Sequence, residues 1–109
     1  MYIMEQVVIL ARVSTDKQEY YRQINELTDY CRQRNWEVVE VFANKVSGAA
    51  TNEQRAEIQE LVEYVKNHQI SRVVCLEISR VGRNTLEALK VIQLLNENRV
   101  SLFVKNYNL

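Results

Sequence analysis

Residues 6–14 read QVVILARVS, a run of apolar and β-branched residues that predicts a buried strand. Similar runs follow at residues 36–42 (WEVVEVF), 71–78 (SRVVCLEI) and 100–105 (VSLFVK). Between these runs, residues 18–34, 53–68 and 85–98 carry apolar side chains at helical spacing. Strands that alternate with helices are typical of parallel βαβ units. We therefore expect a three-layer α/β fold, with a mainly parallel central sheet of about four strands and helices on both faces.

The composition fits one compact domain over residues 1–109, of which 47% are hydrophobic. The longest apolar stretch, VVILA, is far shorter than the roughly 20 residues that cross a bilayer, and no signal-peptide pattern opens the chain. Cys31 and Cys75 lie within apolar patterns, which favours buried thiols over a disulfide framework. These features predict a cytoplasmic protein without a membrane partner.

No proline and no low-complexity tract divides the chain. The longest irregular stretch, ANKVSGAATN at residues 43–52, is predicted to be a loop. The last predicted strand runs almost to Leu109, and a sheet that ends there looks unfinished. We therefore expect the sequence to be the truncated part of a longer protein.

The charges balance, because 14 basic residues face 14 acidic ones. A domain that binds DNA by itself usually has a basic surplus, which drives the release of counterions from the phosphates. The balance therefore argues against strong DNA binding by these residues alone. It remains compatible with chemistry on a single phosphate if another part of a longer protein holds the DNA.

Two polar side chains lie at the carboxyl end of the first strand. Alternate residues of a strand share a face, so Arg12 and Ser14 belong to the same face as Val8 and Leu10. Open α/β sheets bind their ligands at the carboxyl ends of their strands. We therefore expect Arg12 and Ser14 to form part of a site, with an anion-binding arginine beside a candidate nucleophile.

A second basic cluster, ISRVGRN at residues 78–84, follows the third predicted strand. If that strand is parallel to the first, Arg80 and Arg83 reach the same edge of the sheet as Ser14. Arginine suits a phosphate, because its planar fork stays charged and binds two oxygens at once. The pattern thus predicts several guanidinium groups around one serine.

Simpler interpretations exist for each of these residues. Thr15 and Gln18 have the spacing of a capping box, so the segment around Ser14 could simply begin a helix. Arg80 and Arg83 could be solvated charges at a helix entry. His68, the single histidine, lies near a predicted helix end, where a helix C-terminal role is favoured over catalysis.

Several familiar sites are missing from the sequence. It has no Walker loop, no GxGxxG, no cluster of Cys and His ligands, and no histidine placed for a serine triad. Hydrolase and nucleotide-binding functions therefore lose their usual support. A serine among arginines is typical of phosphoryl transfer, in which catalysis is mostly positioning and charge stabilisation.

The segments ARVSTDKQ (residues 11–18) and EISRVGRN (residues 77–84) resemble the nucleophile motif and the second arginine motif of the resolvase and invertase family of serine recombinases. The resemblance spans essentially the whole chain, including the SG of the loop at residues 47–48. It implies a resolvase-like catalytic domain with Ser14 as the nucleophile. The other implied site residues are the phosphate-binding Arg12, Arg80 and Arg83, the additional Arg55, and the supporting Gln18 and Gln23.

The resemblance implies site-specific DNA recombination, such as the integration or inversion of mobile DNA. By the same resemblance, the serine is expected to cleave and rejoin double-stranded DNA through a 5′-phosphoserine intermediate, with neither a metal nor another cofactor. It further implies self-association, with a dimer that forms a tetramer in the active complex. A long oligomerisation helix and a DNA-binding domain would follow the catalytic domain.

The sequence departs from the family pattern at two positions. Ser79 stands where the family commonly has an aspartate, and Leu10 replaces a tyrosine, a change that we interpret as packing. Ser79 keeps open the interpretation that the chain is a recombinase-like assembly domain that no longer cleaves DNA. A second alternative is an α/β module that binds a phosphorylated ligand through the same arginines, with Ser14 acting only as a helix cap.

Overall fold

The computed structural model describes residues 4–13, 17–45, 51–76 and 85–105. Strands and helices alternate along the chain, as the sequence predicts. Their bounds, in chain order, are β1 (Glu5–Val13), α1 (Lys17–Gln33), β2 (Trp36–Lys45), α2 (Thr51–Asn67), β3 (Arg72–Cys75), α3 (Thr85–Glu97) and β4 (Ser101–Val104).

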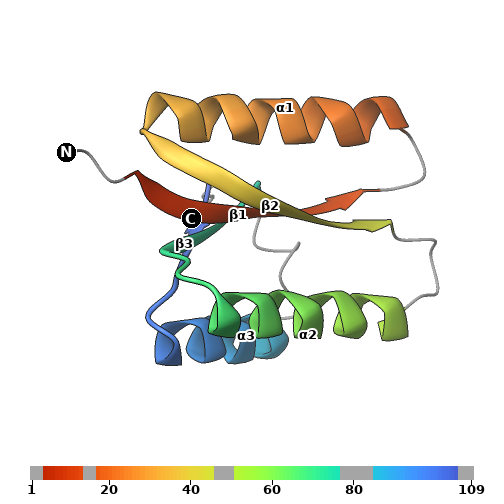
Figure 1. Cartoon of the computed structure of the whole chain (residues 1–109). Coiled ribbons are helices and arrows are strands. Elements are labelled where there is room, and N and C mark those ends of the chain that lie inside the picture. The colour runs from red at the N-terminus through yellow and green to blue at the C-terminus, as the bar shows by residue number, and fades with distance from the viewer. Residues whose placement is uncertain (1–3, 14–16, 46–50, 77–84, 106–109) are drawn as a thin grey trace.

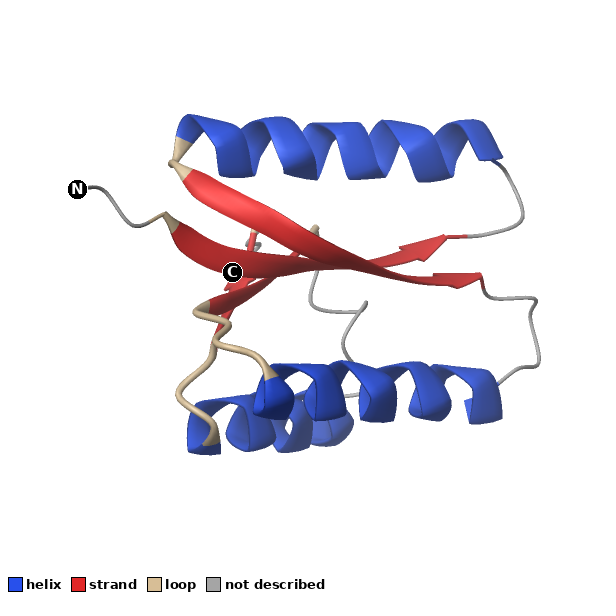
Figure 2. Cartoon of the chain, viewed as in Figure 1, coloured by secondary structure: helices blue, strands red, loops and turns tan. Residues whose placement is uncertain are grey.

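The four strands form one sheet in the order β2-β1-β3-β4, and every neighbouring pair is parallel. Helix α1 covers one face of this sheet, and α2 and α3 lie together on the other (Figures 1 and 2). Crossovers between parallel strands are right-handed. The connection from β1 to β2 runs along the sheet in one direction, and the connections from β2 to β3 and from β3 to β4 run in the opposite direction. Right-handed crossovers therefore place α1 on one face and α2 and α3 on the other. The expected three-layer α/β fold is confirmed.

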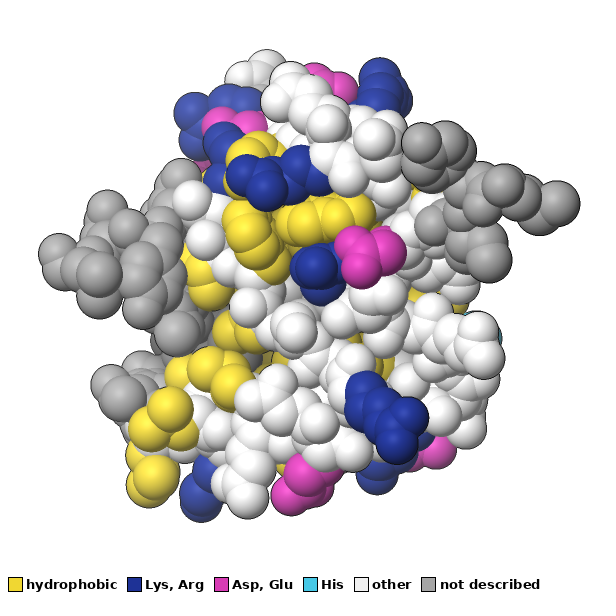
Figure 3. All heavy atoms as spheres, turned by 90° about the vertical axis from the view of Figure 1, so that its left-hand side faces the viewer, with side chains coloured by type: hydrophobic (Ala, Val, Ile, Leu, Met, Phe, Trp, Pro, Cys, Tyr) yellow, Lys and Arg dark blue, Asp and Glu magenta, His cyan; other side chains and the backbone are white. Residues whose placement is uncertain are grey.

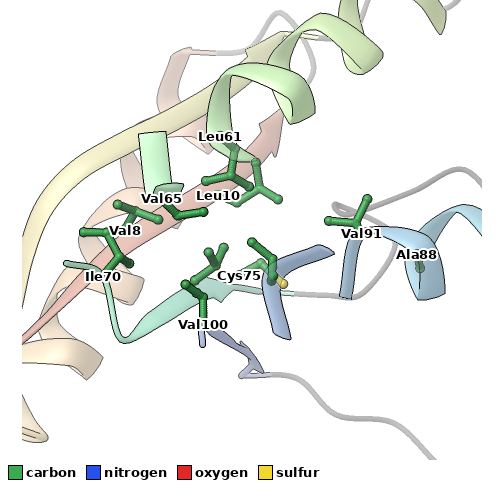
Figure 4. Packing of buried hydrophobic residues seen from close by; sticks show 11 residues of the cluster. Val8, Leu10, Leu61, Val65, Ile70, Cys75, Ala88, Val91 and Val100 are labelled. Atoms are coloured by element: carbon green, nitrogen blue, oxygen red, sulfur yellow. The ribbon is translucent and has the colours of Figure 1, made fainter. Parts of the chain in front are cut away.

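The two faces of β1 build two separate cores. Val8 and Leu10 are buried against α2 and α3, in a cluster with Leu61 and Leu95 (Figure 4). On the opposite face, the neighbouring residues of β1 pack beneath α1. Residues 7–10 therefore alternate between the two faces of the sheet, as expected for this strand.

The second strand is longer than the sequence pattern predicts. Residues 43–45, expected in a loop, belong to β2 because they pair with the end of β1, Ala43 beside Ala11 and Lys45 beside Val13. Helix α2 begins at Thr51 rather than at residue 53. Strand β3 pairs only as far as Cys75, and residues 77 and 78 of the predicted strand lie outside the described residues. None of the helices in the described part of the chain has the length and apolar composition of a membrane span.

Candidate functional site

The carboxyl ends of β1 and β3 meet at one edge of the sheet. Leu10 of β1 pairs with Cys75, the last residue of β3, and the two strands are parallel. The chain therefore leaves both strands at the same edge, which is the condition on which the predicted site depends. Ser14 follows β1 directly, and the segment with the second arginine motif follows β3. Ser14, Ser79, Arg80 and Arg83 themselves lie outside the described residues.

The two other predicted arginines are described in their backbone only. Arg12 lies in β1, where it pairs with Asn44 of β2 near the carboxyl ends of both strands. Arg55 lies in the first turns of α2, the helix that follows the carboxyl end of β2. Both backbones thus belong to the edge at which Ser14 leaves the sheet (Figure 1). Their side chains lie outside the described residues.

The two predicted glutamines have different surroundings on α1. Gln18 is exposed in the first turn. Gln23 lies on the buried side of the helix with Leu27 and Cys31, and only 3% of it is exposed. Its position is one helical turn closer to the candidate site than Leu27, because α1 starts at the carboxyl edge of the sheet.

The side-chain oxygen of Gln23 is buried without a hydrogen-bond partner among the described residues. Leaving a buried acceptor unsatisfied costs about 1–3 kcal/mol, and such groups in native proteins call for an explanation. An apolar residue would fill the same place at lower cost. Gln23 is thus a buried polar side chain on the part of α1 that lies nearest the candidate site.

The cysteines and the histidine are not arranged as a catalytic or metal-binding group. Cys31 and Cys75 are buried and form no disulfide, and burial raises the pKa of the Cys31 thiol, which favours its protonated form. His68 lies just beyond α2, where its Nδ1 is 2.9 Å from the carbonyl oxygen of Tyr64. Within the described ranges, no group of His, Cys, Asp and Glu is placed to hold a metal ion.

Known proteins match this fold and this sequence. Over 93 residues, the chain is 30% identical to a "Resolvase" of Clostridium perfringens (strain 13 / Type A). The aligned part covers 84% of this chain and 44% of that protein, so the chain spans less than half of its relative's length.

Two solved structures share most of the architecture. The C-terminal catalytic domain of ISC1926 TnpA, an IS607-like serine recombinase, is 30% identical, with a TM-score of 0.79 over 94% of this chain and 69% of that one. The N-terminal catalytic domain of TP901-1 integrase is 25% identical, with a TM-score of 0.77 over 94% and 78% of the two chains.

The sequence profile of the family described as "Resolvase, N terminal domain" matches residues 7–109, from the first strand to the last residue of the chain. The match includes both motifs that carry the resemblance. The chain belongs to the resolvase N-terminal domain family.

Proposed function

We propose that the chain is the catalytic domain of a serine recombinase that cleaves and rejoins duplex DNA at specific sites. The parallel pairing of β1 with β3 carries this proposal, because the ARVS and SRVGR segments follow these two strands at one edge of the sheet. Membership of the resolvase family supports it, since both motifs occur here in the order that the family has.

In the proposed reaction, the oxygen of Ser14 attacks a phosphorus atom of the DNA backbone. A bond forms between this oxygen and the phosphorus, and the bond to the 3′ oxygen of the deoxyribose breaks. The proton lost by Ser14 goes to the 3′ oxygen, and the 5′ end remains attached as a phosphoserine. After strand exchange, a 3′ hydroxyl attacks the phosphoserine and restores both the phosphodiester and the serine.

The arginines would stabilise the negative charge that develops on the phosphate. Arg12, Arg80 and Arg83 are the proposed phosphate ligands, and Arg55 approaches from α2. Preorganised cationic donors stabilise a transition state because they need no reorganisation when the charge appears. Phosphodiester energy is kept in the phosphoserine bond, so the proposed cycle consumes no nucleotide.

The proposed partners are duplex DNA and further copies of the protein. Each copy supplies one serine and cuts one strand, so breaking both strands of two sites takes four copies. The zero net charge indicates that strong DNA affinity comes from another part of a longer protein. Cys31 and Cys75 are buried and not joined in a disulfide, which fits a reducing cytoplasm, the compartment that we propose for the reaction.

Trapping of the covalent intermediate tests the proposal. The full-length protein is incubated with a nicked DNA substrate whose cleaved strand diffuses away, and the adduct is resolved on a denaturing gel. We expect an adduct with the parent protein and none with Ser14→Ala, while folding and DNA binding remain nearly unchanged. An adduct with Ser14→Ala would exclude this serine as the nucleophile. A parent protein that binds its site without forming an adduct would favour the assembly-domain alternative, which Ser79 keeps open.

A further inference from the structure

Two neighbouring side chains near the amino end of α1 are exposed to solvent. Tyr21 is 60% exposed, and Arg22 is exposed beside it. The next residue, Gln23, is buried on the side of α1 that packs on the sheet. Tyr21 and Arg22 therefore contribute little to the core, and their side chains are accessible to a molecule outside the chain.

The ring of Tyr21 is held by a neighbouring ring. Tyr20 is half-buried, and the centroids of the two rings are 5.3 Å apart with an angle of 72° between their planes. This edge-to-face arrangement is attractive for a pair of aromatic rings. A side chain that is already restricted loses less entropy when it binds a ligand. Tyr21 is thus an exposed side chain with part of its freedom already lost.

The position of these residues on α1 places them close to the candidate site. Helix α1 begins at Lys17, three residues after Ser14, at the carboxyl edge of the sheet (Figure 1). Arg22 lies only about 7.5 Å further along the helix axis. The bonds from Cα to Cβ in a helix tilt toward its amino end. The side chains of Tyr21 and Arg22 therefore lean toward the edge at which Ser14 leaves β1.

The charges along α1 are unevenly distributed. Residues 17–25 contain two basic residues and one acidic residue, whereas residues 26–33 contain one basic and two acidic residues. The end of α1 nearest the candidate site is therefore the more basic one. Arg32, in the other half, lies 3.8 Å from Asp29. Among the described residues, Arg22 has no carboxylate partner, so its guanidinium is open to an anion from outside the chain.

Two arginines at the opposite edge of the sheet differ from Arg22 in this respect. Figure 3 shows that edge, where basic, acidic and hydrophobic side chains lie close together. Arg72 pairs there with Glu5, and the guanidinium carbon of Arg34 lies 4.5 Å from the ring centroid of Tyr30. Both guanidinium groups thus have contacts within the fold. Arg22 has neither kind of contact in the described part of the chain.

We propose that Arg22 and Tyr21 bind the DNA backbone beside the phosphate that Ser14 attacks. The inference rests on the proposed function, because cleavage by Ser14 brings duplex DNA to this edge. Phosphates of one strand recur about every 3.4 Å along the axis, so the first turns of α1 span the two or so nucleotides next to the cleaved bond. The fork of Arg22 suits two phosphate oxygens, and the Tyr21 hydroxyl can donate one hydrogen bond. Such contacts position DNA without reading its sequence.

Binding of the full-length protein to the nicked duplex of the adduct assay tests this inference. The dissociation constant is measured at several salt concentrations, because each lost phosphate contact makes the salt dependence less steep. We expect Arg22→Ala to weaken binding by about tenfold and to reduce the slope of log K against log salt by about one. Arg22→Lys should keep the slope, since it keeps the charge. Tyr21→Phe should weaken binding by roughly threefold at an unchanged slope, because only a hydroxyl is lost.

Neutral phosphates locate the contact. Single methylphosphonates are placed, one per duplex, within about three nucleotides of the nick. At the contacted position, a methylphosphonate should weaken binding by the parent but cause no further loss in Arg22→Ala, which lacks that contact already. Arg32→Ala is the matched control, since it removes an exposed charge about 15 Å further along α1 and should bind every duplex like the parent. Thermal unfolding shows whether each variant is folded.

Other results would overturn the inference. A folded Arg22→Ala variant with the affinity and slope of the parent would show that Arg22 does not contact DNA, and equal losses in Arg32→Ala would show a general effect of charge. Weaker self-association of Arg22→Ala with unchanged DNA binding would identify a protein as the partner. The trapped adduct is a separate readout. An adduct with normal binding by the Arg22 variants refutes this inference alone, whereas a mapped contact of Arg22 in a parent that forms no adduct refutes the proposed cleavage alone.

Discussion

Leu10 of β1 lies beside Cys75 of β3 in parallel register, and both side chains are buried in the same core (Figure 4). This pairing aligns the ends of the two strands that precede the recombinase motifs. Ser14 is four residues beyond Leu10, and Arg80 is five residues beyond Cys75. The chain segments are short, so the register limits how far the proposed nucleophile and phosphate ligands can lie from the shared edge.

Removal of a phosphate-binding arginine should slow cleavage without unfolding the protein. We expect Arg80→Ala and Arg83→Ala each to reduce the cleavage rate by roughly 100-fold or more, the scale for one preorganised donor lost from a transition state. Lysine at either position should restore part of the rate. Single-turnover cleavage of the nicked substrate measures the effect. Both alanine variants cleaving at the parent rate would refute the phosphate-binding role.

A carboxylate introduced before Arg80 should restore the family pattern. We expect Ser79→Asp to increase the cleavage rate, because an adjacent carboxylate can orient a guanidinium through charge-assisted hydrogen bonds. Ser79→Asn is the control, since it has nearly the same shape without the charge. The same single-turnover assay applies. Equal rates for all three proteins would show that cleavage here does not need the carboxylate, as expected if Glu77 already replaces it.

Replacement of Gln23 by an apolar residue should affect the stability of the fold and the cleavage rate differently. Gln23→Leu removes a buried oxygen that has no partner among the described residues, so the free energy of unfolding should stay equal or rise by about 1 kcal/mol. Cleavage should slow if the amide supports the site. Leu27→Ala, one turn further along the same buried side, should instead cost about 2–5 kcal/mol.

Urea unfolding and single-turnover cleavage give the two readouts for Gln23→Leu. A loss of stability comparable to that of Leu27→Ala would show that the amide oxygen is satisfied in the folded protein. Unchanged cleavage in a stable Gln23→Leu variant would remove Gln23 from the supporting set.

The Cys31 thiol should make the stability of the fold sensitive to alkaline pH. Burial raises the pKa of this thiol, so the folded protein holds the proton more tightly than the unfolded chain does. The stabilisation is complete below the ordinary thiol pKa and is lost as the pH rises through the folded value. We expect the free energy of unfolding to decrease in this range, and to decrease less in Cys31→Val. Identical pH dependence of the two proteins would contradict a shifted Cys31.

Much of the architecture could be predicted from local sequence. The alternation of residues 6–14 and the helical spacing of Leu27 and Cys31 depend on the backbone period of each element, which neighbouring residues determine. The elements, their order and the α/β class follow from these periods. The motifs around Ser14 and Arg80 are also local, and together with the family profile they identify the resolvase domain without reference to any distance.

The tertiary structure decided what depends on partners distant in the chain. Residues 43–45 belong to β2 because their backbone pairs with the end of β1, as far as Val13. The composition of residues 43–45 is typical of a loop, so the sequence of this segment alone does not indicate the pairing. The side-chain oxygen of Gln23, which has no hydrogen-bond partner among the described residues, is buried only once α1 packs on the sheet. Arg34 meets Tyr30, Trp36 and Phe103 because the strand order β2-β1-β3-β4 and the packing of α1 bring these elements together. The periodicity of the sequence determines which face of a helix or strand each side chain occupies. Which of these faces contact one another depends on the packing of the whole chain.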